Sequence, residues 1–282
     1  MSGSVRHVGL VAGGGDLPLH VAAAVKEAGD QLTVLEIEPD SPVGRFDDSF
    51  RLSLSKFGKV LKHFKRRGVT HVCLAGNVGR PDFSTFRPDL GAMRYLPSTL
   101  KAARQGDDSL LRHVMGIFEG QGFSILSPQS ICESLLLPAG PLGRTSLPAE
   151  HRADAERAME IASVIGTHDI GQGAVVAGGL VLAVEAQEGT DAMLSRVAQL
   201  PAALRGSGGV LAKRLKPGQD GRVDMPTIGL KTVELAIGAG LAGIIVDEGE
   251  AFVLDREAVI ERADVAGLFI VGLPKRRDNG AA

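Results

Sequence analysis

The sequence predicts an α/β protein with two domains, a doubly wound first domain and a second domain built on a mixed sheet. The length of 282 residues is typical of two domains of ordinary size. Short apolar runs alternate with helical patterns in the first half, whereas glycine turns join apolar runs in the second half. We expect domains at 1–137 and 149–274, a Pro- and Gly-rich linker at 138–148, and a flexible tail at 275–282.

The first half is expected to form a parallel sheet with helices on both faces. Apolar runs at 7–12, 31–38, 70–76 and 123–127 are the predicted strands. Between them, apolar residues recur every three or four positions at 17–29, 56–68 and 107–122, which predicts helices. Gly68 is expected to end the second helix, and Asp107 or Asp108 to cap the third.

The second half is expected to combine hairpins with helices. The run "GAVVAGGLVLAVEA" predicts a hairpin around Gly178-Gly179, and "AGIIVDEGEAFVLD" predicts another around Glu248-Gly249. Further strands are expected at 209–215 and 268–273. Helices are expected at 154–166, at 190–200, in the later part of 227–240 and before the last strand. Hairpins among parallel strands make the expected sheet mixed.

Composition and charge exclude several classes of protein. The net charge is -2, Trp is absent and Tyr occurs once, so we expect no nucleic-acid partner. Cys73 and Cys132 stand in apolar surroundings and indicate buried reduced thiols, as in the cytoplasm. No apolar stretch approaches the roughly 20 residues that cross a bilayer. We therefore expect a cytoplasmic protein whose membrane contact is peripheral.

A glycine-rich turn follows the first predicted strand, and three interpretations of it stay open. In "GLVAGGGDLP" it resembles a dinucleotide fingerprint, with Glu36 or Glu38 as the ribose-binding acid, but the third glycine position is Pro18. Alternatively, its backbone N–H groups contact a phosphate or sugar. In the third interpretation it is a tight turn without ligand, and Asp16 caps the following helix. The candidate residues are Gly13, Gly14, Gly15, Asp16 and Leu17.

A second loop, "AGNVGRPDF", follows the third predicted strand. Its candidate residues are Asn77, Gly79 and Arg80. Ligands of doubly wound sheets bind beyond the carboxyl ends of the strands, so this loop and the glycine turn are expected to share a crevice. Arg80 is either a phosphate partner or a surface arginine.

Acidic residues gather at a strand-to-helix junction in the second half. Glu185, Glu188 and Asp191 lie in "AVEAQEGTDAMLSR", where Thr190 or Asp191 is expected to cap the helix. Carboxylates at a helix N-terminus are stabilised by its dipole. Capping and solvation explain these residues as well as a functional role does.

The segment "KPGQDGRVDMPTIG" has the composition that hydrolysis of a diphosphate requires. It holds Gln219, Asp220, Arg222 and Asp224 in a stretch whose Pro and Gly prevent a regular helix, and Lys213 precedes it. Mg²⁺ takes one or two carboxylates plus phosphate oxygens, and a guanidinium neutralises charge on a transferred phosphoryl group. A solvated acidic turn is the alternative interpretation.

Other charged residues give weaker signals. His113 and His168 have no partner at metal-ligand spacing, so core or surface roles are favoured. The predicted helix at 56–67 carries Lys and Arg opposite its apolar stripe. Such a face is solvated, or it rests on an anionic membrane surface.

Taken together, the motifs resemble one known family over residues 6 to 273. "GLVAGGGDLP", "AGNVGRP", "GDDSLLR", "VLAVEAQEGTDAML" and "KPGQDGRVDMPTIG", in this order, are similar to LpxI-type UDP-2,3-diacylglucosamine pyrophosphatases of lipid A biosynthesis. The resemblance implies a Mg²⁺-dependent hydrolase that yields 2,3-diacylglucosamine 1-phosphate and UMP. It also implies a Rossmann-like first domain and a lipid substrate held between the domains.

Carried onto this chain, the resemblance makes Asp224 the essential residue, either as a Mg²⁺ ligand or as the base that orients water. We infer that Asp191 is a second metal ligand and that Glu188 takes part in catalysis. Substrate contacts are expected from the glycine turn, from Arg80 and Lys213, and from Asn77, Gly79, Asp108, Thr190, Gln219 and Arg222. Contact with the cytoplasmic face of the inner membrane and a homodimer complete these expectations.

Two other functions remain as alternatives. The first is an NAD- or flavin-dependent enzyme that uses the glycine turn, against which Pro18 argues. The second is a non-catalytic protein that binds a nucleotide-sugar lipid.

Overall fold

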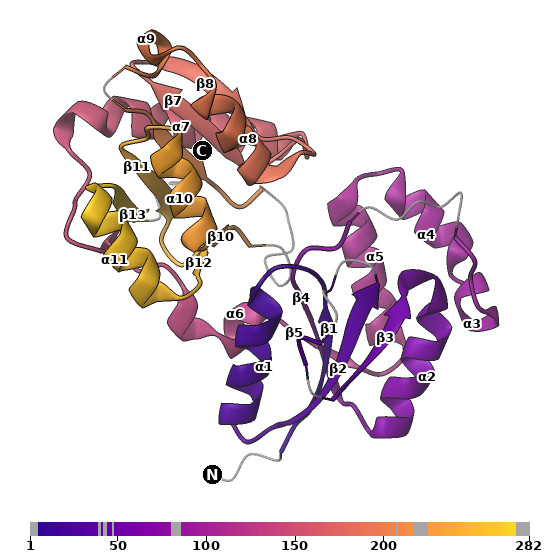
Figure 1. Ribbon diagram of the computed structural model, residues 1–282. Helices are drawn as coiled ribbons and strands as arrows, with labels where there is room; N and C mark the ends of the chain where they lie inside the picture. The colour runs from indigo at the N-terminus through magenta and orange to yellow at the C-terminus, as the bar shows by residue number, and fades with distance from the viewer. Residues whose placement is uncertain are drawn as a thin grey trace, which may run out of the picture. The chain divides into compact units, whose positions relative to one another are not determined.

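The computed structural model describes residues 5–38, 41, 44–46, 48–79, 86–206, 208–216 and 225–274. The described chain forms two compact units that meet in sequence between Glu133 and Ser134. Figure 1 labels the elements of both units. We call the described residues up to Glu133 unit 1 and those from Ser134 unit 2.

Unit 1 is doubly wound, as predicted. Its sheet is parallel throughout and has the strand order β3 (Ser49–Ser53), β2 (Gln31–Glu38), β1 (His7–Ala12), β4 (His71–Ala75), β5 (Ser124–Leu126). The four predicted strands are confirmed, and β3 is an additional edge strand. The order reverses direction at β1 and β4, which is where ligands bind in sheets of this type.

Helices cover both faces of this sheet. The predicted helices are α1 (Leu17–Glu27), α2 (Phe57–Arg67) and α5 (Asp107–Gly120). Short helices were not predicted: α3 (Leu90–Met93), α4 (Leu96–Ala103), α6 (Pro128–Ile131) and the 3₁₀ turns η1 (Leu54–Lys56) and η2 (Glu133–Leu135, across the boundary between the units). The face under α2 and α5 is filled by Phe64, Phe118 and Phe123, whose rings pack at centroid distances of 5.9 to 6.3 Å. Gly68 ends α2 in the left-handed region (φ 75°), as predicted.

Unit 2 contains the predicted mixed sheet. Its six strands have the order β6 (Gly140–Pro141), β13 (Phe269–Leu273), β11 (Gly243–Asp247), β9 (Val210–Lys213), β7 (Gly173–Ala177), β8 (Leu180–Val184). The strands β9, β11 and β13 are parallel, whereas β7 runs antiparallel to both of its neighbours and β6 antiparallel to β13. Residues 138–148, expected as a linker, thus supply an edge strand to the sheet.

Four longer helices of unit 2 sandwich its sheet. The helix α7 (Arg152–Thr167) packs on one face through its alanines. The helices α8 (Gly189–Ala198), α10 (Leu230–Gly238) and α11 (Arg256–Ala266) cover the other face. Short pieces complete the unit: the 3₁₀ turn η3 (Ala149–His151), α9 (Ala202–Arg205) and the two-stranded pair β10 (Thr227–Ile228) and β12 (Phe252–Val253).

One of the two predicted hairpins is confirmed and the other is wrong. Gly178 and Gly179, with φ of 55° and 76°, turn the chain from β7 into its antiparallel partner β8. The turn at Glu248-Gly249 does not make a hairpin, because both edges of β11 are occupied by the parallel strands β9 and β13. After the turn, the chain instead forms β12, which pairs in parallel with β10.

The predicted side-chain caps of α1, α5 and α8 are wrong, because no residue at the N-cap position of these helices makes a capping hydrogen bond with its side chain. Asp16 lies at the N-cap position of α1 without a capping hydrogen bond and pairs with Arg45 instead, at 2.6 Å. The helix α5 begins at Asp107, with Gly106 at the N-cap position, so Asp107 and Asp108 both lie in its first turn. Similarly, Glu188 precedes α8, and Thr190 and Asp191 lie within its first turn.

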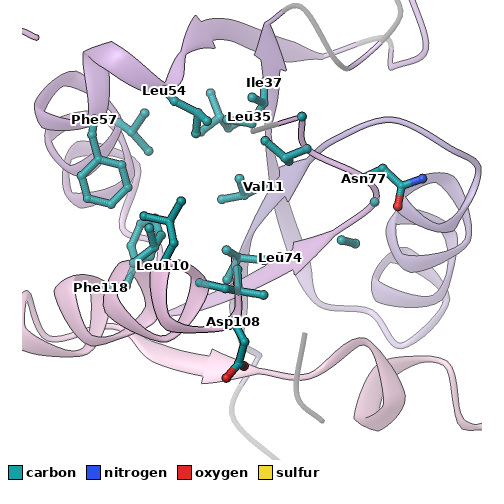
Figure 2. Close-up of a pocket in the computed structure, with 17 residues that line it drawn as sticks. Val11, Leu35, Ile37, Leu54, Phe57, Leu74, Asn77, Asp108, Leu110 and Phe118 are labelled. Atoms are coloured by element: carbon teal, nitrogen blue, oxygen red, sulfur yellow. The ribbon is translucent and has the colours of Figure 1, made fainter. Parts of the chain in front are cut away.

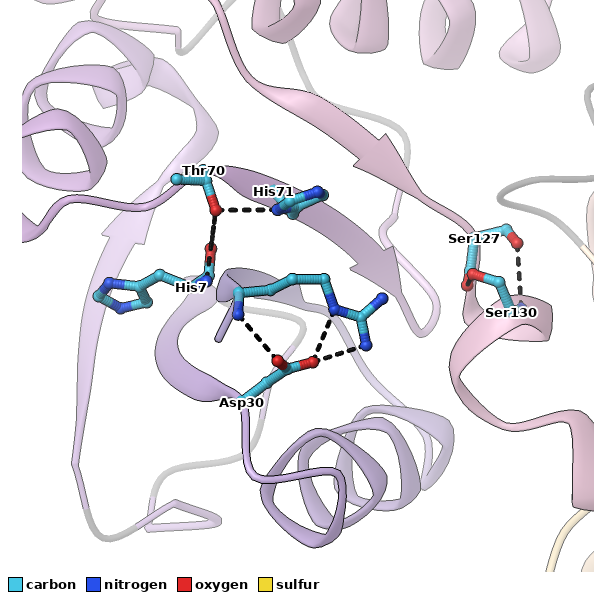
Figure 3. A network of polar contacts seen from close by, with 7 residues as sticks. His7, Asp30, Thr70, His71, Ser127 and Ser130 are labelled. Atoms are coloured by element: carbon cyan, nitrogen blue, oxygen red, sulfur yellow. Dashed lines mark hydrogen bonds and ion pairs between the residues drawn. The ribbon is translucent and has the colours of Figure 1, made fainter. Parts of the chain in front are cut away.

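A polar network ties together the amino ends of β1 and β4 (Figure 3). Arg6 donates from its backbone and side chain to Asp30, at 2.9 and 2.8 Å. Thr70 donates to the carbonyl of His7 and contacts Nδ1 of His71. This end of the sheet lies opposite the carboxyl ends of the strands, where ligands bind in sheets of this type. We therefore assign the network to stabilising the fold and not to binding a ligand. No helix of the described residues is long and apolar enough to span a membrane.

Candidate functional site

In unit 1 the two predicted loops meet at the carboxyl ends of β1 and β4. The N–H of Gly13 donates to the carbonyl of Ala75 at 2.9 Å, and that of Gly14 to the carbonyl of Asn77 at 2.7 Å. Asn77 donates back to Gly14 at 2.9 Å. A Cβ at position 13 would lie 2.4 Å from the Asn77 oxygen, so only glycine permits this approach.

These hydrogen bonds change the interpretation of the glycine turn. The N–H groups of Gly13 and Gly14 are already donated within the protein and do not point to an open anion site. Glu36 is 1% exposed, and it accepts hydrogen bonds from Ser41 and Arg51. A buried and fully bonded carboxylate is not presented to a ribose, which removes one support of the NAD-type alternative.

An apolar cavity of about 300 Å³ opens beside these loops in unit 1. Figure 2 shows aliphatic and aromatic side chains around the space and Asn77 and Asp108 at its margin. Three predicted site residues therefore line one cavity: Asn77, Gly79 and Asp108. The apolar lining comes from strands, η1 and helices, namely Val11, Leu35, Ile37, Leu54, Phe57, Val60, Leu74, Ala75, Val78, Leu110, Leu111, Val114 and Phe118.

Among the described residues that line this cavity, Asp108 is the charged one. Its Oδ2 pairs with Arg112 at 2.6 Å, one turn later on α5. Its Oδ1 is buried and has no hydrogen-bond partner among the described residues. A buried carboxylate oxygen without a donor is costly, so Oδ1 requires a donor from beyond the described residues.

In unit 2, Glu185 and Lys213 flank Gly173 at one edge of the sheet. Lys213 ends β9 and pairs in register with Gly173 of β7. On the other side, the N–H of Glu185 donates to the carbonyl of Gly173 at 2.8 Å. Because the three residues lie side by side on neighbouring strands, the side chains of Glu185 and Lys213 project to the same face of the sheet. Both residues are buried: Glu185 is 6% exposed and Lys213 is 5% exposed.

The glycines beside Glu185 make room for its side chain. A Cβ on Gly173 would lie 2.6 Å from Glu185 Oε2, and one on Gly171 would lie 2.1 Å from its carbonyl oxygen. Thr190 donates to Oε1 at 3.0 Å, whereas Oε2 is buried without a hydrogen-bond partner among the described residues. Gln172 likewise has a buried, unpartnered Oε1.

Two helix N-termini lie on the same face as this row. The first turns of α8 and α10 are joined by Asp191 and Lys231, whose side chains pair at 2.8 Å. Glu188 pairs with Arg196 at 2.5 Å. A hydrogen bond from its own backbone amide, reinforced by Arg196, holds the pKa of Glu188 below its usual value. Helix dipoles and Lys213 favour an anion at this edge.

The described residues at this edge offer few oxygen donors for a metal ion. Among the residues that the structure describes, no group of three His, Cys, Asp or Glu side chains is placed to hold a metal ion. Mg²⁺ needs fewer protein ligands when phosphate oxygens complete its coordination. The unpartnered Oε2 of Glu185 is an oxygen donor of the required kind.

The central part of the segment that the sequence favours most, residues 217–224 with Gln219, Arg222 and Asp224, falls outside the described residues. Arg80, in the loop after β4, falls outside them as well. Of the neighbouring residues, Lys216 pairs with Asp169 at 2.7 Å. The structure adds two residues to the candidates, Glu185 and Gln172. Sequence reasoning noticed Glu185 without assigning it a role, and Gln172 had no signal beyond its two flanking glycines.

The comparisons with known proteins decide the family. The LpxI N-terminal domain matches residues 7–135, and the LpxI C-terminal domain matches residues 138–271. The chain belongs to the LpxI family. A curated family member, UDP-2,3-diacylglucosamine pyrophosphatase LpxI of Caulobacter vibrioides, is 49% identical over 280 residues, which cover 97% of this chain and all of that protein.

Solved structures are much more distant from this member of the LpxI family. CobK precorrin-6A reductase is 13% identical, with 99% of this chain and 91% of its own covered, at a TM-score of 0.33. UDP-glucose 4-epimerase of Thermus thermophilus, in complex with NAD, is 17% identical, with 97% and 88% covered, at a TM-score of 0.31. Similarities of this size carry no argument about ligand or activity.

Proposed function

We propose that the protein hydrolyses the diphosphate of UDP-2,3-diacylglucosamine, yielding 2,3-diacylglucosamine 1-phosphate and UMP, in lipid A biosynthesis. The observation that carries this proposal is the 49% identity, over nearly the whole of both chains, to a UDP-2,3-diacylglucosamine pyrophosphatase. The chemistry of each unit is consistent with a substrate that has acyl chains at one end and phosphates at the other.

In unit 1 the apolar cavity is suited to an acyl chain. Aliphatic and aromatic side chains make up most of its lining. Each methylene group that leaves water contributes about 0.8 kcal/mol. Asn77 and Asp108 at the margin supply polar contacts for the sugar or amide groups beside the chain, and we retain Gly79 and the glycine turn as neighbours of the substrate.

In unit 2 the edge with Glu185 and Lys213 is suited to the diphosphate. The ammonium of Lys213 and the N-termini of α8 and α10 stabilise the negative charge of phosphates. We assign the reaction to Asp224, Asp191 and Glu188, with Thr190, Gln219 and Arg222 in contact with substrate. Glu185 joins this set because its buried Oε2 has no hydrogen-bond partner among the described residues and is an oxygen acceptor at this edge.

We also propose Mg²⁺ as the cofactor, held by Asp191 and Asp224. When bound, Mg²⁺ neutralises charge on the diphosphate. The residues do the remaining work: Arg222 and Lys213 bind phosphate oxygens, and a carboxylate orients the attacking water. For Asp224 the roles of ligand and base both stay open.

Release of UMP by the purified chain is the direct test. The Asp224→Ala variant is expected to lose UMP release while thermal unfolding stays unchanged. Chelation of divalent cations should stop turnover, and added Mg²⁺ should restore it. Full activity of the variant would remove Asp224 from the mechanism, and turnover in the chelator would remove the metal.

The same assay separates the alternatives. A non-catalytic lipid-binding protein would release no UMP on prolonged incubation with substrate and Mg²⁺. An NAD-type enzyme would bind the dinucleotide tightly in calorimetry. We further propose that the enzyme works in the cytoplasm with peripheral contact to the inner membrane, and a homodimer stays a prediction.

A further inference from the structure

The short helix α3 presents apolar side chains to solvent in unit 1. Leu90 is 89% exposed and Met93 is 54% exposed. A helix of four residues is not stable by itself, so its position depends on its neighbours. Neighbouring exposed apolar side chains that are rimmed by polar residues mark interaction surfaces, whereas singly scattered ones are common on all proteins.

Asp89 fixes α3 to the first turn of α2. Its carboxylate accepts from the N–H of Ala92 at 2.7 Å, of Gly58 at 3.2 Å and of Lys59 at 2.8 Å. The two backbones also touch, because a Cβ at Gly58 would lie 2.6 Å from the Cα of Gly91. Three hydrogen bonds and a close glycine contact therefore hold an exposed leucine in place.

Basic residues surround this apolar tip. The side chain of Lys56 donates to the carbonyl of Arg87 at 2.8 Å, and the guanidinium of Arg94 lies 5.0 Å from the ring of Tyr95. We call the following residues the α3 patch: Lys56, Lys59, Arg87, Leu90, Met93 and Arg94.

The charge of the surrounding sequence is strongly positive. Between Leu54 and Gln105 there are eleven Lys and Arg, two Asp and no Glu, although the whole chain has a net charge of -2. Of the two aspartates, Asp89 is occupied by backbone N–H groups. A region of this charge attracts anionic surfaces.

An apolar cavity lies directly beneath the patch. It is lined by Phe86, Ala92, Tyr95 and Leu96 from the α3–α4 region. It shares further lining residues with the 300 Å³ cavity beside the glycine turn, namely Leu54, Phe57, Leu110 and Val114. The two apolar cavities are therefore neighbours that share four wall residues.

We propose that the α3 patch docks the protein on an anionic membrane surface, with Leu90 and Met93 among the lipid headgroups. This inference rests on the proposed function only in that the substrate is a membrane lipid. The exposed aliphatic pair distinguishes a bilayer from nucleic acid, which would need stacking or base-reading groups at the centre of the patch. The basic rim supplies electrostatic attraction, and the apolar tip supplies insertion.

The test is co-sedimentation of the full chain with vesicles of phosphatidylcholine alone and of phosphatidylcholine with phosphatidylglycerol. We expect binding to the anionic vesicles that weakens as salt increases. The double variant Leu90→Ser, Met93→Ser should bind them about tenfold more weakly, since it removes the two aliphatic side chains that would enter the headgroup region. The matched control is Val265→Ser, which changes a 78% exposed valine on α11 and should bind like the parent chain.

A charge variant tests the rim separately. Lys59→Glu combined with Arg94→Glu should abolish the preference for anionic vesicles. Thermal unfolding of every variant verifies the fold, which exposed positions should leave intact.

Three results would overturn the inference: equal sedimentation of the double variant and its parent, equal binding to neutral and anionic vesicles, or preference for duplex DNA over anionic vesicles. Failure of the proposed function is distinguishable from failure of this inference. Hydrolysis of substrate dispersed in neutral detergent measures the activity without a bilayer, and the double variant should retain it.

Discussion

At the scale of single residues, buried polar atoms without partners are the strongest indication of a ligand in this protein. Backbone and side-chain groups inside proteins are nearly always hydrogen-bonded, so each exception requires a reason. In the part of the chain that the structure describes, Glu185 has one carboxylate oxygen bound by Thr190 and the other without a partner, and Asp108 likewise has one paired and one unpaired oxygen. Both residues stand at carboxyl edges of sheets, where ligands of α/β proteins bind.

We predict that Glu185→Gln lowers the kcat of UMP release by about 100-fold, because the amide removes the charge and keeps the shape. Thermal stability should be unchanged or higher, since a buried charge is removed. The control is Glu160→Gln, an exposed position on α7. Parent-like kcat in Glu185→Gln would show that the carboxylate has only a structural role.

A second prediction at this scale concerns Asp30 and pH. Hydrogen bonds from Arg6 lower the pKa of Asp30 below its ordinary value of 3.8. A lowered pKa stabilises the folded state above pH 3.8, and this contribution is lost as the pH falls through the folded-state pKa. Asp30→Asn should therefore reduce the free energy of unfolding by about 2 kcal/mol at neutral pH, as expected for hydrogen bonds to a charged group.

Urea titrations at a series of pH values measure this effect. The difference between the parent and Asp30→Asn should shrink below pH 3.8, where the parent loses its advantage. Asp48→Asn is the control, because Asp48 is 87% exposed and its contact with Arg67 is 3.4 Å long. Its cost should stay below about 0.5 kcal/mol. A constant difference at all pH values would contradict the assignment.

At the scale of elements, the main role of the glycine turn after β1 is to hold the loop after β4, because its N–H groups bind that loop and are not left for an anion. Its first two N–H groups are donated to the loop after β4. Gly76, with φ of 89°, also lies close to this turn, since a Cβ there would lie 2.4 Å from the carbonyl oxygen of Gly14. The turn therefore fixes the position of Asn77 beside the cavity.

We predict that Gly13→Ala destabilises unit 1 by about 1–3 kcal/mol, because the added Cβ would meet the Asn77 carbonyl at 2.4 Å. The control is Gly116→Ala, at a position of α5 where a Cβ meets nothing within 4 Å. That substitution should stabilise the helix by roughly 0.5–1 kcal/mol. Thermal unfolding compares the two variants, and equal effects would refute the steric argument.

Sequence patterns predicted the regular elements better than their pairing. Mostly apolar runs identified β1, β2, β4 and β5. The strand β2 was recognised although it also carries the buried polar residues Thr33 and Glu36. The edge strand β3 was not predicted, because its alternation of Phe50 and Leu52 with polar residues extends over only five positions. The false hairpin at Glu248-Gly249 has a proper turn, but strand order decides which neighbour β11 accepts, and local sequence does not contain strand order.

The candidate site was predictable only in part, for a similar reason. The loop with Asn77 and Gly79 was expected beside the glycine turn, because carboxyl ends of parallel strands share one edge, whereas Asp108, which lines the same cavity, was named only through the family resemblance. The space that the Glu185 side chain occupies exists because Gly171 and Gly173 have no side chains there. No spacing in the sequence reveals this close approach. Asp16 looked like a helix cap because its partner Arg45 is distant in sequence.

At the scale of the whole molecule, charge is distributed unevenly along a nearly neutral chain. The stretch from Leu54 to Gln105 has a large excess of basic residues, and acidic residues predominate elsewhere. Net charge alone therefore conceals the attraction of one region for anionic surfaces.

We predict that turnover of substrate in anionic vesicles falls more steeply with salt than turnover of substrate in neutral detergent. Screening weakens attraction to the vesicle surface, whereas the chemistry within a bound complex is less affected. Initial rates of UMP release at increasing salt measure both dependences. The double variant Leu90→Ser, Met93→Ser should be slower on vesicles only, and parallel salt curves would argue against a membrane-bound working form.

The two thiols of the chain offer a practical route to that surface. Cys73 and Cys132 are both buried, and burial raises the pKa of Cys132 to about 11 and that of Cys73 further. Since maleimides react with exposed thiolates, neither native cysteine competes with one introduced by Leu90→Cys. A fluorophore or spin label attached there would report directly how deeply α3 enters a bilayer, without any cysteine-free background having to be engineered.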